Sequence, residues 1–452
     1  MAHSNYIRKS TSLITARVVL LLSALFYALS IGVGHSLYLS KMQSFWGFNT
    51  PIYNASSVAI AVIFIALPAC VLPLRITRPS TVFLYSLIFF VYIPCIVISM
   101  LNFEDSLSRY FWILLFSCIG CISCSVAIRL FGADSGGGKG PSIGLIAVNV
   151  FGALISFMFL FSEYKDILSF SGLNDIYVQR ERGAATSLFI GYCQVYLAYV
   201  FSPFLFIYGM IYKRFLFLIF GVFCFLFVFM ITAERTIILL PFAFLAIYFV
   251  FARRGFVVSN MSYLFVFGGV VILTISLFYN SSRFLSELGV YFFTRTIAGP
   301  GLLVSQYYDL FSVQGYTHWS HVSIIGRLAD VPPAYLGDSK WPALGKILAE
   351  RVLGIESQSN ASFLATDGVA AWGGAGVLII FVVYTCWLLV LDRVAKGWNK
   401  LFIFPLIFPM AFVSTNASLF TMMTSFGGFF WLASFYLDKY KFRLRAQGAE
   451  NV

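Results

Sequence analysis

Long apolar stretches alternate with short polar segments along most of this chain. Most of these stretches have about the length, roughly 17–25 residues, that a helix needs to cross the hydrocarbon core of a bilayer. Lipid offers no partner for backbone N–H and C=O groups, so a crossing segment satisfies them internally as a helix. The pattern therefore predicts an all-α polytopic membrane protein with about 12 transmembrane helices.

The last two predicted spans are separated only by a polar turn around Asn416. The full set comprises Ile14–Gly34, Ser56–Leu74, Thr81–Leu101, Tyr110–Leu130, Ser142–Ser162, Leu188–Tyr212, Phe215–Ile231, Thr236–Phe251, Ser262–Asn280, Gly368–Leu391, Leu401–Ser414 and Phe420–Leu437.

One long polar segment separates the ninth and tenth predicted spans. It divides the chain into residues 1–280 with nine helices and short loops, a large loop at residues 281–367, and residues 368–452 with three helices and a basic tail. A carrier or channel can be built from spans joined by short turns. A loop of this length therefore indicates binding or chemistry.

The beginning of this loop has its own apolar pattern. Apolar residues recur at mostly helical spacing from Phe284 to Thr296, which predicts an amphipathic helix at the membrane interface. We expect Gly299-Pro300-Gly301 to stop this helix and Leu302 to Phe311 to form a second short helix. The large loop is thus expected to be partly helical.

Composition and charge agree with a membrane protein and give it an orientation. Hydrophobic residues make up 60% of the chain and charged residues 11%, whereas ordinary soluble domains are about 45–50% apolar. The net charge of +12 is concentrated in alternate polar segments, such as Arg253-Arg254 and the C-terminal tail, while most acids lie in the others. The positive-inside rule then predicts cytoplasmic termini and an outward large loop, so the charge is a topology signal and does not indicate nucleic acid.

Several familiar kinds of site are unsupported by the sequence. All eight cysteines fall within predicted spans, so no disulfide framework is expected. The glycine-rich segment around Lys139 lacks the Ser or Thr that follows the lysine of a phosphate loop. No His, Cys or carboxylate set has metal-ligand spacing, so we expect neither a metal nor a cofactor. The spans also lack the central charges of ion-coupled carriers, which weakens a transporter interpretation.

Arginines recur at the predicted outward ends of the spans. Arg180 follows Tyr177 just before the sixth span, and Arg235 follows Glu234 at the start of the eighth. A guanidinium presents a planar fork to phosphate oxygens and keeps its charge at any relevant pH. Arg235 is therefore a candidate to bind a phosphate group. The alternative is that its side chain only contacts lipid headgroups or pairs with Glu234.

The large loop holds further candidates for chemistry. Arg295 is predicted at headgroup level, and Arg327 lies farther along. His318 and His321 are three residues apart, which would make them neighbours on one turn if that segment is helical. Histidine titrates near neutral pH and can take a proton from a sugar hydroxyl, but an ordinary hydrogen-bonded surface histidine fits the same pattern.

The chain resembles the Wzy-type polymerases of O-antigen and related oligosaccharide repeat units. Beyond the predicted spans and the outsized loop, the resemblance rests on short motifs: Asn174-Asp175-Ile176-Tyr177-Val178-Gln179-Arg180, Glu234-Arg235-Thr236, Arg295 with Gly299-Pro300-Gly301, Asn360-Ala361-Ser362-Phe363, Asp367-Gly368 and Gly373-Gly374-Ala375-Gly376.

The resemblance implies a metal-independent glycosyltransferase of a bacterial inner membrane that acts at the periplasmic face. Its donor would be a glycan on undecaprenyl diphosphate, its acceptor a hydroxyl of another lipid-linked repeat unit, and a chain-length regulator a possible partner. The catalytic candidates are His318, His321 and Glu234, with the loop closing over the site as a lid. The substrate-binding candidates are Arg180, Arg235, Arg295, Arg327, Tyr177 and Asp309, with Asp309 or Glu234 as a substitute base.

Two other functions fit parts of the same pattern. An O-antigen ligase would transfer the same kind of glycan to lipid A core and would also use outward arginines and a loop histidine. A lipid-oligosaccharide flippase would instead predict a basic cavity within the bundle and short loops on both sides of the membrane.

Overall fold

The computed structural model describes residues 2–170, 176–252, 260–322, 325–326 and 341–438. Within these ranges the regular structure is entirely helical, as the apolar pattern predicts. Nine helical segments there are long and apolar enough to cross a membrane. They are Ile14–Met42, Pro79–Leu101, Ser106–Phe131, Ile143–Ile167, Leu188–Ile211, Phe215–Thr232, Arg235–Ala252, Met261–Phe278 and Leu364–Val394.

The other three predicted spans are shorter or broken. The second corresponds to α3 (Ala55–Val71) and the eleventh to α18 (Lys400–Val413), both shorter than the other spans. The twelfth is interrupted after α19 (Leu419–Thr424), because Gly427 adopts a left-handed conformation with φ of +87°, and helix resumes at residues 428–438. Apolar composition alone does not reveal such breaks.

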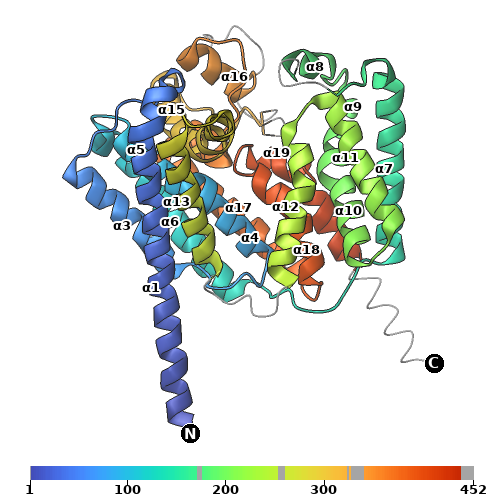
Figure 1. Ribbon diagram of the computed structural model, residues 1–452, viewed down its shortest axis with the longest axis horizontal. Coiled ribbons are helices and arrows are strands. Elements are labelled where there is room, and N and C mark those ends of the chain that lie inside the picture. Colours follow the sequence, from blue (N-terminus) through green and yellow to red (C-terminus); the bar gives the residue numbers. More distant parts are fainter. Residues whose placement is uncertain (1, 171–175, 253–259, 323–324, 327–340, 439–452) are drawn as a thin grey trace.

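Each half of the bundle is held by pairs of packed helices (Figure 1). In one half, α1 (Ala2–Gly34) packs along α13 (Asn260–Phe278), and α6 (Ser106–Phe131) along α17 (Ala370–Val394). In the other, α10 (Ser202–Ile211) packs on α11 (Phe215–Thr232), and α12 (Arg235–Ala252) on α18. The neighbours in sequence α12 and α13 thus belong to different halves.

The other helices complete these two groups. They are α2 (Ser40–Met42), α4 (Pro79–Leu87), α5 (Ile93–Leu101), α7 (Ile143–Tyr164), α8 (Ile176–Arg182), α9 (Leu188–Tyr196), α14 (Arg283–Leu288), α15 (Gly299–Gln314) and α16 (Leu344–Leu348), with 3₁₀ turns η2 (Ser44–Trp46) and η4 (Lys165–Ile167). Six π-helical segments are η1 (His35–Leu39), η3 (Ile88–Tyr92), η5 (Leu197–Phe201), η6 (Gly289–Ala298), η8 (Ala349–Leu353) and η9 (Leu364–Val369).

The start of the large loop is one continuous helical run, so the predicted stop at Gly299-Pro300-Gly301 is wrong. Residues 283–314 pass from α14 through η6 into α15. Pro300 lies in the first turn of α15, where a missing N–H costs little. Gly301 lies against α5, and a Cβ there would be 2.6 Å from the carbonyl carbon of Pro94. The glycines therefore permit close packing. Residues 302–311 are helical as predicted, but they belong to this continuous run and not to a separate short helix.

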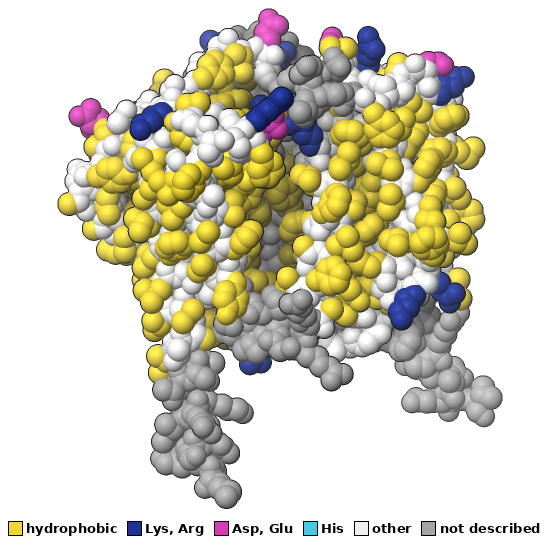
Figure 2. Space-filling view, viewed as in Figure 1, with side chains coloured by type: hydrophobic (Ala, Val, Ile, Leu, Met, Phe, Trp, Pro, Cys, Tyr) yellow, Lys and Arg dark blue, Asp and Glu magenta, His cyan; other side chains and the backbone are white. Residues whose placement is uncertain are grey.

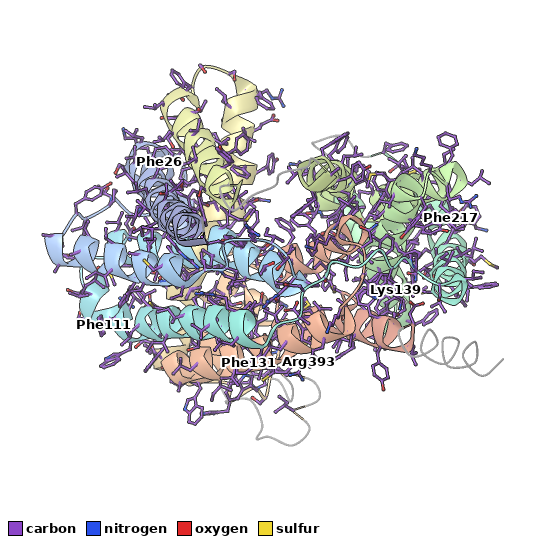
Figure 3. The ribbon with its side chains drawn as sticks, turned by 90° about the horizontal axis from the view of Figure 1, so that it is seen from below. Phe26, Phe111, Phe131, Lys139, Phe217 and Arg393 are labelled. Carbon is purple, nitrogen blue, oxygen red and sulfur yellow. The ribbon has the colours of Figure 1, made fainter. Side chains whose placement is uncertain are left out.

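The two ends of the bundle differ in charge. In Figures 1 and 2, α8 and α16 lie at the top, opposite the start of α1, and we call this end the upper face. The acidic side chains visible in Figure 2 all lie toward it. The view from below shows Arg393 at the end of α17 beside the end of α6, and Lys139 among the C-terminal helices (Figure 3). Lys139 pairs with Asp438 at 2.8 Å and lies 5.2 Å from the Trp398 ring centroid.

Candidate functional site

Two of the predicted arginines converge on one aromatic ring at the upper face. The guanidinium carbon of Arg235, the first residue of α12, lies 4.2 Å from the ring centroid of Tyr291. The guanidinium carbon of Arg295, one turn beyond Tyr291 on η6, lies 5.9 Å from the same centroid and 5.6 Å from that of Trp46. Segments from three parts of the chain thus bring two cations together.

These two cations share the ring of Tyr291. Among the described residues, neither Arg235 nor Arg295 makes an ion pair. The negative face of an aromatic ring attracts a guanidinium and leaves most of its N–H donors available. Guanidinium groups that keep their donors in this way are suited to an anion with several oxygens. The sequence motif located the arginines, and the structure adds Tyr291 and Trp46.

Arg295 depends on a small buried polar network beneath Trp46. The backbone oxygen of Trp46 accepts a hydrogen bond from Nε2 of Gln306 at 2.9 Å, and the next oxygen, of Gly47, accepts one from Nδ2 of Asn102 at 2.9 Å. Gly47 has φ of +95°, a conformation that favours glycine. The turn that carries the Trp46 ring is therefore held in place by hydrogen bonds from Gln306 and Asn102.

Glu234 does not pair with Arg235, its neighbour in sequence. Its Oε1 accepts a hydrogen bond of 2.5 Å from the Tyr199 hydroxyl. Burial raises the pKa of the Glu234 carboxyl, and this effect exceeds the lowering by the Tyr199 hydrogen bond and by the nearby charge of Arg180. Arg180 itself is exposed on α8, which is anchored where Gln179 donates to the Met230 oxygen at 2.7 Å. The Glu234 carboxyl is thus buried against Tyr199 and does not occupy the donors of Arg235.

The side chains of three residues named in the sequence motifs and predictions lie outside the described part of the structure. Arg327 lies outside the described residues, as does Asp175 of the motif before the sixth span. Tyr177 lies on the described backbone of α8, but its side chain lies outside the described part.

His318 and His321 lie in a tight turn, so the helical arrangement considered for them is not formed. His318 and Trp319 both have positive φ, +46° and +59°. This left-handed region is costly for residues other than glycine, and such strain concentrates at functional sites. The backbone N–H groups of Thr317 and His318 donate to the oxygens of Ala370 and Ala371 at 2.9 and 3.0 Å. The turn is therefore fixed on the start of α17, and this part of the loop is not a free lid.

The two histidines have different surroundings. His318 is exposed, with its ring 6.3 Å from that of Trp372. The His321 side chain is only 8% exposed. Its Nδ1 lies 2.7 Å from the Thr317 hydroxyl oxygen, and its Nε2 lies 3.4 Å from Oδ1 of Asp367.

Asp367 is the central residue that the sequence interpretation missed as a site residue. It is fully buried on η9, at the start of the helical segment that continues as α17. Its Oδ1 accepts from the Ser418 hydroxyl at 2.8 Å, and its Oδ2 accepts from the Leu419 N–H at 2.5 Å. Its backbone oxygen accepts from Nε1 of Trp319 at 2.8 Å. An acid at the predicted edge of a span, 46 residues from the histidine, gives no pattern that joins the two.

Asp309 is engaged elsewhere, between two helices. Its carboxylate pairs with Nε of Arg109 at 2.7 Å and accepts from the Tyr110 hydroxyl at 2.7 Å. Burial raises the pKa of the Asp309 carboxyl despite these partners. These contacts join α15 to the start of α6. Asp309 therefore fits a structural role better than the role of a substitute base.

A hollow separates the two halves of the molecule (Figure 2). Figure 2 shows it running down the face between the elements that Figure 1 identifies as α13 and α12, with dark blue and magenta side chains at its upper end. Apolar side chains border it on both sides. In the part of the chain that is described, no group of three or more His, Cys, Asp or Glu residues is suited to hold a metal ion.

The geometry thus groups the candidates into an arginine pair with Tyr291 and a histidine turn with Asp367. Comparison with models of protein families, with curated proteins and with solved structures found no match to this chain.

Proposed function

We propose that this protein polymerises oligosaccharide repeat units that are carried on a lipid diphosphate. In this reaction a sugar hydroxyl of one lipid-linked unit attacks the anomeric carbon of a second, and the lipid diphosphate leaves. The observation that carries the proposal is the pair of Arg235 and Arg295 on the Tyr291 ring, without a described carboxylate partner. Outside a cell no nucleotide sugar is at hand, so the substrate itself must carry the activated bond.

The arginine pair is assigned the diphosphate. Each guanidinium offers parallel N–H donors to phosphate oxygens, and two of them match the charge that develops on the leaving group. The N-terminus of α12, which begins at Arg235, adds backbone donors and the positive end of its dipole. Arg180, which we place at the same face, is assigned a second contact with the substrate, near the junction of the diphosphate and the glycan.

The hollow between α12 and α13 is assigned the lipid chain. A polyprenyl tail needs an apolar path from the bilayer to the head-group site, and apolar side chains border this hollow. Charged side chains lie at its upper end, and we assign the diphosphate of a lipid whose tail lies in the hollow to the arginine pair. This arrangement supports a lipid-linked substrate over a soluble one.

The histidine turn is assigned the acceptor. His321 serves as the base for the acceptor hydroxyl, because it is fixed by Thr317 and Asp367 while His318 lies exposed at the edge of the turn. Direct attack by the acceptor would invert the anomeric centre. The exposed ring of Trp372 beside His318 offers a face on which a sugar can stack.

In the proposed topology the chain crosses a bacterial inner membrane about twelve times, with both termini in the cytoplasm. The upper face, with the large loop, then lies in the periplasm. The clustered basic residues of the other end support this orientation through the positive-inside rule. The shorter helices α3 and α18 and the broken segment 419–438 would complete the crossings within the bundle.

A reconstitution experiment tests the proposal. The purified protein in vesicles receives a defined undecaprenyl diphosphate-linked oligosaccharide, with or without lipid A core, and the products are separated by size. A ladder of lengthened glycans without lipid A core is expected. Transfer only to lipid A core would show a ligase, and flipping of the lipid without new glycosidic bonds would show a carrier. Either result contradicts the proposed polymerase.

A further inference from the structure

Two arginines from different helices meet at the end of α3, on the side of the molecule opposite the upper face, which we call the lower end. Arg17 of α1 donates from Nη1 to the Leu72 oxygen, and Arg129 of α6 donates from Nη1 to the Val71 oxygen at 3.4 Å. The two charges are close enough to repel each other. Figure 3, seen from below, shows Phe131, the last residue of α6, at this end.

The end of α3 attracts these cations but does not neutralise them. The last carbonyl oxygens of a helix lack partners within the helix and together carry roughly half a negative charge. The next oxygen along the chain, of Pro73, is already satisfied by the Tyr85 hydroxyl at 2.7 Å. Two guanidiniums therefore leave more than one positive charge uncompensated. Each also has five N–H donors, and most of them remain after its bond to the carbonyl oxygen.

The acids near the lower end of α6 have other partners. Asp134 pairs with Nε of Arg78 at 2.6 Å, and Asp392 accepts from the N–H and the hydroxyl of Ser80 at 2.9 and 2.6 Å. Among the described residues, neither arginine at the end of α3 makes an ion pair. Arg75, exposed just beyond α3, adds further positive charge. The charge at this helix end thus calls for an anion from outside the chain.

This arginine pair is accessible and lies beside apolar surface. Arg129 is exposed and Arg17 is partly exposed. The three helices that meet here also carry exposed apolar side chains close to the arginines along the chain, such as Leu22 of α1, Leu67 of α3 and Leu130 of α6. In a bilayer such side chains contact acyl chains, whereas arginines at helix ends lie at the level of the head groups.

We infer that Arg17 and Arg129 bind the phosphate of an anionic phospholipid, whose acyl chains lie on the exposed apolar faces of α1, α3 and α6. A guanidinium matches phosphate oxygens with parallel donors, and basic sites between transmembrane helices are suited to anionic head groups. A free phosphate ion would use the arginines but not the apolar faces. The site is separate from Arg235 and Arg295 at the upper face and does not depend on the proposed glycosyl transfer.

The test titrates the purified full chain in detergent with dioleoyl phosphatidylglycerol and, separately, with dioleoyl phosphatidylcholine, and counts bound lipid by native mass spectrometry. The wild-type protein should bind phosphatidylglycerol more tightly, and inorganic phosphate should not displace it. Arg17→Gln and Arg129→Gln should each weaken phosphatidylglycerol binding about fivefold, and the double variant at least tenfold, as expected for arginines at an anionic lipid surface. The matched control is Arg214→Gln, which removes an exposed arginine just before α11 in the other half and should keep wild-type affinity.

A second measurement needs no variant. Cys70 is exposed in the last turn of α3, and Cys386 is exposed on α17. Phosphatidylglycerol should slow the reaction of Cys70 with N-ethylmaleimide more than that of Cys386, and phosphatidylcholine should not. Equal protection of both thiols, wild-type affinity in the double variant, or displacement of the lipid by inorganic phosphate would each overturn the site. A lowered melting temperature of the double variant with unchanged lipid affinity would show that the arginines only cap α3.

Discussion

At the scale of single residues, the arginine pair is distinguished by the partner that holds it. Arg235 and Arg295 are held by the ring of Tyr291 rather than by an acid. A carboxylate would bind the same N–H donors that a phosphate needs, whereas an aromatic face fixes the guanidinium and leaves its edges free. This arrangement leads to a prediction that separates arginine from lysine.

Arg235→Lys keeps the charge but loses the planar fork and much of the stacking on Tyr291. We expect the rate of chain growth at low substrate to fall at least tenfold, which corresponds to about 1.4 kcal/mol of lost transition-state binding. The measurement is kcat/KM on the defined lipid-linked oligosaccharide.

The matched control is Arg283→Lys on α14. Arg283 is exposed and pairs with Glu287 one turn away at 2.8 Å, a kind of surface pair that contributes little. Its replacement should leave chain growth unchanged. Equal rates for Arg235→Lys and Arg283→Lys would contradict the assigned phosphate contact.

Glu234 predicts a pH dependence of stability. Because burial raises the pKa of its carboxyl in the folded state above the ordinary value of 4.5, the folded protein holds this proton more tightly than the unfolded chain. The free energy of unfolding therefore falls as pH rises from about that value through the folded pKa. Glu234→Gln removes the titration and keeps an acceptor for Tyr199.

The measurement for Glu234 is the melting temperature in detergent at several pH values. The difference between Glu234→Gln and wild type should move in favour of the variant as the pH is raised from 4 toward neutrality. A constant difference across this range would show that the carboxyl has no raised pKa.

At the scale of elements, the histidine turn shows how local strain is supported by packing. The two positive φ values at His318 and Trp319 persist because the turn bonds to the start of α17. Helix α17 is itself kinked there, with Gly373 at φ of +56° beside the hydroxyl of Tyr316. The strain and the kink together bring Thr317 and His321 to Asp367.

Substitution at His318 tests this strain. Asn tolerates the left-handed region, whereas Val does so with the greatest difficulty. We expect His318→Asn to melt at or above the wild-type temperature and His318→Val to be less stable than His318→Asn by about 1–2 kcal/mol. The reverse order of melting temperatures would contradict the left-handed turn.

The contacts of Asp309 predict a structural effect at the junction of α15 and α6. Asp309→Asn should lower the free energy of unfolding by about 1–2 kcal/mol, because a hydrogen bond to a charged group is weakened. The rate of chain growth per folded protein should stay close to wild type. A large loss of rate with unchanged melting temperature would instead place Asp309 in the reaction.

At the scale of the whole molecule, the difference between the two ends predicts an orientation. Ser357 is exposed in the large loop, and Gly138 is exposed at the other end, where an added Cβ meets no atom within 4 Å. In intact bacterial spheroplasts, a membrane-impermeant maleimide should label Ser357→Cys and should label Gly138→Cys only after lysis. Cys70 and Cys386 are the exposed native thiols and are replaced by Ala to remove background. The opposite labelling would reverse the proposed topology.

How much of the molecule the sequence reveals differs between its parts. The all-helical class and the nine long apolar helices of the described residues follow from hydrophobic runs, because such runs are a local property. The break at Gly427 and the continuation through Gly299-Pro300-Gly301 do not follow, because glycine and proline act according to the backbone that surrounds them. The arginines were found by their charge at helix ends, but Tyr291 looked like any interfacial aromatic residue.

The sequence by itself determined that the chain forms helices for a membrane, where its polar loop lies, and which residues are able to carry charge or protons. Only the tertiary structure decided the partners: Arg235 and Arg295 with Tyr291, Glu234 with Tyr199, and His321 with Thr317 and Asp367. The physical reason is the distance along the chain over which each property is set. Burial in lipid depends on each segment's own composition, whereas a hydrogen bond or a shared ring depends on positions that distant segments reach only after packing.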